Sequence, residues 1–132
     1  MAGELILIVE DNEKNLKLTR DLLLLKGYRV LVAGTAEDGV KLAREQHPDV
    51  VLMDVQLPGM DGFAALKVLR DDAATAMLMV VAFTASVMKE DVARIHLSGF
   101  DAYVPKPINV REFPGQIAAL CAQSKASRGE GT

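Results

Sequence analysis

Cysteine is almost absent from this chain of 132 residues, because Cys121 is the only one. An intrachain disulfide is therefore excluded. Long apolar runs are also missing, since none approaches the roughly 18 residues that a membrane-spanning helix needs. The N-terminus lacks the basic start and the small-residue cleavage site of a secretory signal. Together these absences predict a protein of the reducing cytoplasm.

A clustered basic stripe is missing as well. The 15 Lys and Arg residues are outnumbered by 18 Asp and Glu residues, and the net charge is −3. Nucleic acid and anionic membranes bind basic surfaces, so neither is expected as a direct partner. Half of the residues are hydrophobic and 25% are charged, which is the ordinary balance of a soluble globular protein.

The length of the chain fits one domain with a sizeable core. We expect this domain to cover residues 1–123, because residues 124–132 are small and polar and show no hydrophobic pattern. Such a segment cannot bury enough apolar surface to offset the entropy of ordering it, so a disordered tail is predicted.

Continuous apolar runs predict strands that are buried on both faces, and such strands are usually parallel. Between them, apolar residues recur at the spacing of amphipathic helices, so strand and helix alternate five times. This alternation predicts an α/β fold, a doubly wound five-stranded sheet with helices on both faces. The runs cover residues 5–9, 50–53 and 78–83, and weaker strands are expected at 28–33 and 102–104.

Local signals mark several element ends. Thr35 and Asp61 are suited to cap helix N-termini, and Gly27 and Gly99 to end helices in the left-handed conformation. Pro114 and Gly115 fall where the last helix should begin, so a frayed or delayed start is expected there. Three methionines (Met53, Met77 and Met79) lie in or beside predicted strands and are expected in the core, and Cys121 is expected to be at least half buried.

Polar side chains follow the predicted strands. Glu10 and Asp11 come after the first strand, Asp54 after the third, Thr84 after the fourth and Lys106 after the fifth. Each of these residues alone has an ordinary explanation. Glu10 and Asp11 could be acids at the start of a helix, and Asp54 could be an Asx residue that begins a loop. Thr84 could cap the following helix, and Lys106 could be a solvated lysine. The carboxyl ends of parallel strands, however, meet at one edge, where ligands bind. Five polar residues at that edge favour a site.

The residue types narrow the chemistry of this site. Three clustered carboxylates repel one another unless a cation lies between them. Oxygen ligands without His or Cys favour Mg²⁺, which commonly binds one or two carboxylates together with a phosphate. In phosphoryl transfer, Lys106 and Thr84 would stabilise the transition state, and Asp54 would be the nucleophile that accepts the phosphoryl group.

The motifs around these residues resemble a known family, the response-regulator receiver domain of two-component signalling. The similarity covers most of the chain and extends to small single-domain regulators of the chemotaxis and cell-cycle types. It rests on Ile-Val-Glu-Asp-Asn at 8–12, Leu-Met-Asp-Val-Gln-Leu-Pro-Gly-Met-Asp-Gly at 52–62, Phe-Thr-Ala at 83–85 and Tyr-Val-Pro-Lys-Pro at 103–107.

The resemblance implies a flavodoxin-like sheet in the strand order 2-1-3-4-5. It implies Mg²⁺ held by Glu10 or Asp11, by Asp54 and by the backbone carbonyl of Gln56. Asp54 would be the phosphoacceptor, and the donor would be a phosphohistidine on a sensor histidine kinase or a phosphotransfer protein. The phosphate would be lost by slow autodephosphorylation, so the chain is expected to be a switch and not an enzyme.

The resemblance also implies how the switch would work. Thr84 would move toward the phosphate and Tyr103 would turn inward, which remodels a partner surface on the fourth helix, fifth strand and fifth helix. The Lys106–Pro107 bond would be cis. A phosphorylation-dependent homodimer stays open, and the downstream target and cognate kinase are not identified. For Tyr103, an aromatic ring packed permanently at the strand edge is the alternative.

Three other functions compete with the switch. A Mg²⁺-dependent phosphohydrolase of the haloacid-dehalogenase type would need a second acid two residues after its nucleophile, where this chain has Gln56. A binding module without phosphorylation would not need all five site residues. A receiver cut from a hybrid kinase stays open, although Met1 directly before the fold favours a free-standing protein.

Overall fold

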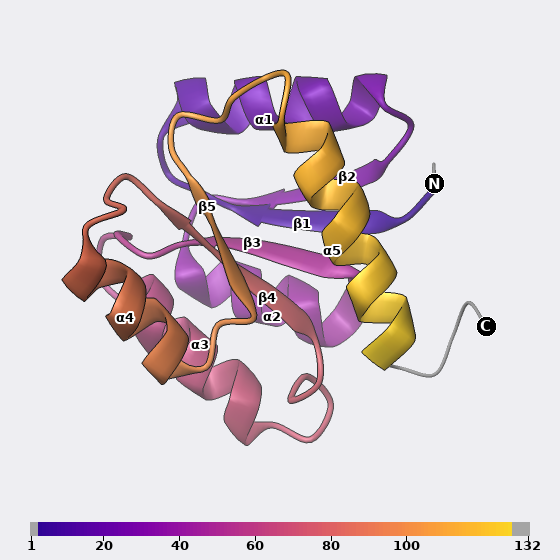
Figure 1. The fold of residues 1–132 in the computed structure, drawn as a ribbon. Helices are drawn as coiled ribbons and strands as arrows, with labels where there is room; N and C mark the ends of the chain where they lie inside the picture. Colours follow the sequence, from indigo (N-terminus) through magenta and orange to yellow (C-terminus); the bar gives the residue numbers. More distant parts are fainter. Residues whose placement is uncertain (1–2, 128–132) are drawn as a thin grey trace.

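In the computed structural model, which describes residues 3–127, five strands alternate with five helices (Figure 1). Within this range no helix has the length and the apolar composition that crossing a membrane requires. The alternation confirms the predicted α/β class. The strands are β1 (Leu5–Val9), β2 (Arg29–Ala33), β3 (Val50–Asp54), β4 (Met79–Thr84) and β5 (Ala102–Pro105), and the helices are α1 (Glu13–Leu25), α2 (Ala36–Gln46), α3 (Gly62–Asp71), α4 (Lys89–Ser98) and α5 (Phe113–Ser127).

The sheet is parallel throughout and has the order β2-β1-β3-β4-β5, as the resemblance implies. Helices α1 and α5 cover one face, and α2, α3 and α4 cover the other (Figure 1). The chain reverses its direction of winding between β1 and β3. In such folds this switch point opens a crevice at the carboxyl ends of the strands.

The central strands are buried on both faces because each face contributes to a separate core. In β1, Leu7 and Val9 pack with residues of α2 and α3, whereas Ile6 and Ile8 pack with residues of α1 and α5. Successive side chains of a strand point to opposite faces, so a doubly covered strand must be apolar at every position. The continuous apolar runs were therefore a reliable signal.

The helix starts follow the predicted caps. The side chain of Thr35 accepts a hydrogen bond from the backbone N–H of Asp38 at 3.1 Å, and Asp61 accepts one from Ala64 at 2.9 Å. Gly99 ends α4 in the left-handed conformation with φ of 105°. The two hydrogen bonds satisfy backbone groups that a helix start would otherwise leave unpaired.

The last helix differs from the prediction at both ends. It begins at Phe113, so the expected delay caused by Pro114 and Gly115 is wrong. The wholly buried ring of Phe113 anchors this turn, and its backbone N–H donates to the carbonyl of Asn109 at 2.8 Å. Proline in the first turn needs no amide donor, which removes its usual cost.

The helix also continues past the expected domain boundary at residue 123, as far as Ser127. The buried hydroxyl of Ser124 donates to the backbone carbonyl of Asp49 at 2.9 Å, and Lys125 pairs with Glu4 at 2.8 Å. The predicted disordered tail is therefore wrong for residues 124–127, and its remainder, residues 128–132, lies outside the described residues.

The predicted burial of the sulfur-containing residues holds with one exception. Met53, Met79 and Cys121 are buried in the core. Met77 was expected there too, but 76% of it is exposed. It lies in the turn before β4, which begins two residues later, so its backbone is outside the sheet.

Candidate functional site

The site is built at the carboxyl ends of the strands. Asp54 is the last residue of β3 and Thr84 the last of β4, and they are only 2% and 3% exposed. Glu10 directly follows β1 and is wholly buried. The apolar strand that precedes Asp54 is packed on both faces, so it fixes the position of the carboxylate.

Lys106 reaches back from the end of β5 to join two of these acids. Its Nζ donates to Oδ2 of Asp54 at 2.9 Å and to Oε1 of Glu10 at 3.2 Å. Its backbone N–H donates to the carbonyl of Thr84 at 2.7 Å, which extends the β4–β5 pairing past Pro105. Burial alone would lower the pKa of Lys106, but hydrogen bonds and charges of Asp54 and Glu10 raise it above its usual value. Lys106 is thus held as a cation.

One ammonium group does not balance the two buried carboxylates. Burial, followed by the hydrogen bond and the charge of Asp54, raises the pKa of Glu10 to about 7. Oε2 of Glu10 is buried and has no hydrogen-bond partner among residues 3–127. A buried carboxylate oxygen without a donor is costly, so this atom is suited to face a further cation.

A third acid completes a set of oxygen ligands. One carboxylate oxygen each from Glu10, Asp11 and Asp54 lies within 4.8 Å of the others. Asp11 is exposed, whereas the other two are buried, so the cluster opens to solvent on one side. Three carboxylates without nitrogen or sulfur ligands fit Mg²⁺ in donor type.

The segment after β3 folds closely around Asp54. The backbone N–H of Gln56 donates to Oδ1 of Asp54 at 2.9 Å, and this orients the carboxylate. The side chain of Gln56 is exposed. Gly62, at the start of α3, packs directly on the backbone of Asp54 and Val55, where an added Cβ would overlap the carbonyl oxygen of Asp54. The sequence reasoning missed Gly62; the Asp-Gly pair at a helix start was the available signal.

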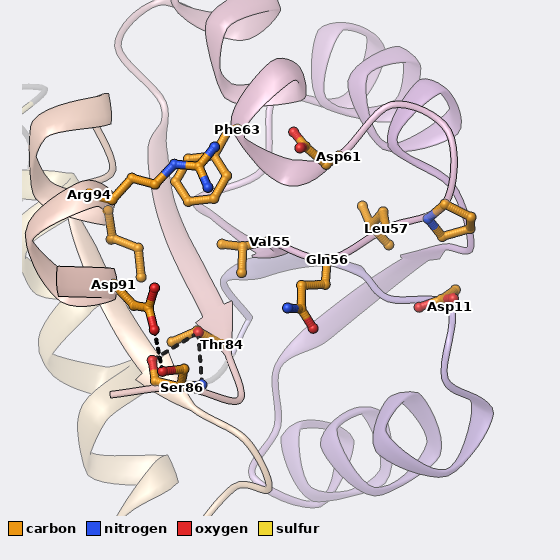
Figure 2. A pocket seen from close by; sticks show the side chains of 12 residues that line it. Asp11, Val55, Gln56, Leu57, Asp61, Phe63, Thr84, Ser86, Asp91 and Arg94 are labelled. Atoms are coloured by element: carbon orange, nitrogen blue, oxygen red, sulfur yellow. Dashed lines mark hydrogen bonds between the residues drawn. The ribbon is translucent and has the colours of Figure 1, made fainter. Parts of the chain in front are cut away.

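A hollow of about 570 Å³ adjoins the cluster between the β3–α3 segment and α4 (Figure 2). Asp11 and Gln56 line one side, and Ser86, Asp91 and Arg94 line the other. The guanidinium group of Arg94 lies over the ring of Phe63, 3.8 Å from its centroid. The hollow therefore meets the cluster at Asp11, its exposed member.

The two residues expected to act as a switch lie on adjacent strands. The hydroxyl of Thr84 donates to the carbonyl of Ser86 and accepts from its backbone N–H, both at 3.1 Å. The ring of Tyr103 is half buried and meets the ring of His96 edge-on at 6.1 Å. The peptide bond between Lys106 and Pro107 is cis, the isomer that the resemblance implies.

The structure thus places Glu10, Asp11, Asp54 and Lys106 together, with Thr84 beside them at the end of the next strand. Two side chains that the sequence reasoning did not single out, Ser86 and Asp91, form a hydrogen bond at 2.5 Å. Their spacing of five residues across a helix start resembles no standard capping pattern, so no sequence signal marked them.

Comparisons with known proteins agree with this geometry. The profile of the response regulator receiver domain matches residues 6–118. Among curated proteins, the polar-differentiation response regulator DivK of Brucella ovis is 45% identical over 108 residues, which cover 82% of this chain and 88% of that protein. DivK of Brucella anthropi is 44% identical with the same coverage.

Solved structures give the same result. The receiver domain of the sensor histidine kinase PA1611 from Pseudomonas aeruginosa, which has a magnesium ion coordinated in its active site cleft, is 30% identical with a TM-score of 0.84. The alignment covers 92% of this chain and 99% of that one. A CheY-like receiver domain protein from Methanospirillum hungatei is 26% identical with a TM-score of 0.84, over 95% and 98% of the two chains.

Proposed function

The chain belongs to the response regulator receiver domain family, and we propose that it is a phosphorylation-dependent switch whose phosphoacceptor is Asp54. It is a signalling protein of two-component systems. The observation that most supports the proposal is the pair of contacts made by Lys106, which joins Asp54 and Glu10 within an acidic cluster open to solvent. A lysine and three acids have no structural need to meet there, whereas phosphoryl transfer needs both charges.

Mg²⁺ is the proposed cofactor. Glu10, Asp11 and Asp54 would hold it, together with the backbone carbonyl of Gln56, and the PA1611 receiver domain supports this by its own magnesium ion. When bound, the ion neutralises charge on the phosphoryl oxygens. The unpartnered Oε2 of Glu10 is the feature of this chain that fits such a cation.

The proposed donor is a phosphohistidine on a sensor histidine kinase or a phosphotransfer protein. A carboxylate oxygen of Asp54 forms a bond to phosphorus while the phosphorus–nitrogen bond breaks, and the released imidazole takes up a proton. The hydrogen bond from Gln56 orients the attacking carboxylate. Lys106 then pairs its charge with the new phosphoryl oxygens, and the hydroxyl of Thr84 turns to donate to one of them.

The expected response of the surface follows from Thr84. When its side chain turns to the phosphoryl group, space opens beside β4, and the half-buried Tyr103 turns inward. This changes the surface of α4, β5 and α5 to which a target binds. The acyl phosphate is lost by slow autodephosphorylation. A cytoplasmic location and a phosphorylation-dependent homodimer stay predictions. The target is not identified, and a pulldown that compares beryllofluoride-treated with free protein would search for it.

Substitution of Asp54 by Asn tests the proposal directly. Incubation with acetyl phosphate and Mg²⁺ should give one acyl phosphate per chain in the wild type and none in Asp54→Asn, as measured by intact mass. Asp38→Asn changes an exposed acid of α2 in the same way and should incorporate phosphate as the wild type does. Full incorporation in Asp54→Asn would contradict the assignment. Several turnovers per second in the wild type would instead favour a phosphohydrolase.

A further inference from the structure

A chain of hydrogen bonds runs from the switch residue Thr84 to the start of α4. Thr84 forms a reciprocal pair with the backbone of Ser86, and the hydroxyl of Ser86 donates to Oδ2 of Asp91 at 2.5 Å. Figure 2 shows this chain along the wall of the hollow. A hydroxyl that donates to an ionised carboxylate over such a short distance is a strong, charge-assisted hydrogen bond.

Ser86 also makes a contact at the start of α4, which has no side-chain cap of its own. The residue at the capping position of α4 is Met88, which makes no side-chain cap. The hydroxyl of Ser86 accepts from the backbone N–H of Met88 at 3.3 Å while it donates to Asp91 in the first turn. It therefore satisfies a backbone donor near the helix start. It also holds the carboxylate of Asp91 at the N-terminal end of α4, where the helix dipole stabilises a negative charge.

Helix α4 depends on such contacts because its own packing is sparse. Ile95 is its only buried residue. Two ring contacts add to this packing, the stacking of Arg94 on Phe63 and the edge contact of His96 with Tyr103. A helix with few buried apolar contacts can change its position at a low cost in free energy.

Ser86 couples Thr84 to the start of α4. Its backbone bonds to Thr84, and its hydroxyl bonds to Asp91 and Met88. Thr84 can donate only one proton, and that proton is engaged by the carbonyl of Ser86. If Thr84 turns to a phosphoryl group, it releases the carbonyl and the N–H of Ser86 together. The Ser86 hydroxyl then loses the backbone support that places it against Asp91 and Met88.

We propose that Ser86 is a positioning residue that holds Thr84 and the start of α4 in the resting arrangement, and that its hydrogen bonds to both must break for activation. This inference rests on the proposed function, since it concerns the motion of Thr84 toward the phosphoryl group. The hydrogen bond between Ser86 and Asp91 is the contact that opposes this motion of Thr84. Loss of this contact raises the population of the activated arrangement and with it the apparent affinity for a phosphoryl mimic.

Beryllofluoride provides the test because it binds an aspartate as a phosphoryl mimic without turnover. Its apparent Kd, measured by titration calorimetry with saturating Mg²⁺ on the full chain, should fall about three- to tenfold in Ser86→Ala and by a smaller factor in Asp91→Asn. Glu90→Gln removes the same charge from the same turn without touching Ser86 and should stay within about twofold of the wild type. Urea denaturation confirms that each variant is folded.

A double variant separates positioning from general loosening. In a Thr84→Ala background the added Ser86→Ala change should no longer alter the Kd, because the effect passes through the threonine hydroxyl. Unchanged or weaker beryllofluoride binding in Ser86→Ala and Asp91→Asn would overturn the inference while leaving the proposed function intact. Absence of Asp54-dependent binding by the wild type would overturn both.

Discussion

Burial and metal binding favour different protonation states of Glu10, because burial favours the neutral carboxyl group and a bound cation favours the carboxylate. Its carboxyl group is wholly buried beside Asp54, and burial is the largest reason that its pKa rises to about 7. Lys106 opposes this rise by its charge and its hydrogen bond but does not cancel it. In the metal-free protein the neutral form of this carboxyl group is therefore favoured to a much higher pH than in water.

The stability of the metal-free protein should fall as pH rises from about 4.5 to about 7. A pKa of about 7 in the folded protein lies above the ordinary 4.5 of this group, so the folded state binds the proton more tightly. The resulting stabilisation is complete below about pH 4.5 and is lost as pH rises through 7. Glu10→Gln keeps the neutral form, so at pH 8 it should be more stable than the wild type by on the order of 1–3 kcal/mol.

Urea denaturation of both proteins in EDTA, at pH 4 and pH 8, measures this difference. At pH 4 the two should agree, because Glu10 is then mostly protonated in both the folded and the unfolded state. Mg²⁺ should reverse the order at pH 8, since a cation favours the ionised carboxylate that Gln lacks. If the wild type has the same free energy of unfolding as Glu10→Gln at pH 8 without metal, then the ionisation of Glu10 does not destabilise the folded state, and this prediction is wrong.

The start of α3 is the element that holds the phosphoacceptor segment in shape. Gly62 lies so close to the end of β3 that a Cβ would overlap the Asp54 carbonyl oxygen and lie 2.7 Å from Cα of Val55. The first atom belongs to the last residue of β3 and the second to the residue that directly follows it, so neither can move without shifting the site. Helix α3 can approach β3 this closely only with glycine at this position.

Gly62→Ala should destabilise the protein by about 1–3 kcal/mol through overpacking and should also weaken Mg²⁺ binding. Gly115→Ala is the matched control, because its added Cβ meets nothing within 4 Å in the first turn of α5. That change should instead stabilise by roughly 0.5–1 kcal/mol. Urea denaturation and Mg²⁺ titration compare the two. Equal effects from both substitutions would show that the close packing at Gly62 is unimportant.

Sequence patterns predicted the elements whose burial is periodic and missed contacts between distant segments. Asp54, Thr84 and Lys106 were found because strand ends converge whatever their neighbours are. The end of α5 was not, because the partner of Ser124 is Asp49, 75 residues away in the chain. The link from Ser86 to Asp91 was missed for a different reason: it spans only five residues, but it depends on the path of one loop.

At the scale of the whole molecule, two clusters of buried polar groups lie at opposite edges of the sheet. The carboxyl edge carries the acidic cluster and Lys106. The opposite edge joins the beginning of β1, the beginning of β3 and the end of α5, where Asp49 accepts from the backbone N–H of Leu5 at 2.8 Å and Ser124 donates to Asp49. Burial alone would raise the pKa of Glu4, but the hydrogen bond from Lys125, a backbone hydrogen bond and the charge of Lys125 together lower it.

Because the two edges are separate, a chain that ends at Gln123 should lose stability and keep its site. Without Ser124 and Lys125, the Asp49 carbonyl loses a hydrogen bond and the buried Glu4 loses its cation, at a cost of about 1–3 kcal/mol in urea denaturation. Ser124→Ala should show about 1 kcal/mol of that loss, and Gln123→Ala, an exposed neighbour, close to none. Mg²⁺ affinity should be unchanged in all three. Weakened Mg²⁺ binding in the shortened chain would mean that the two edges are coupled through the strands.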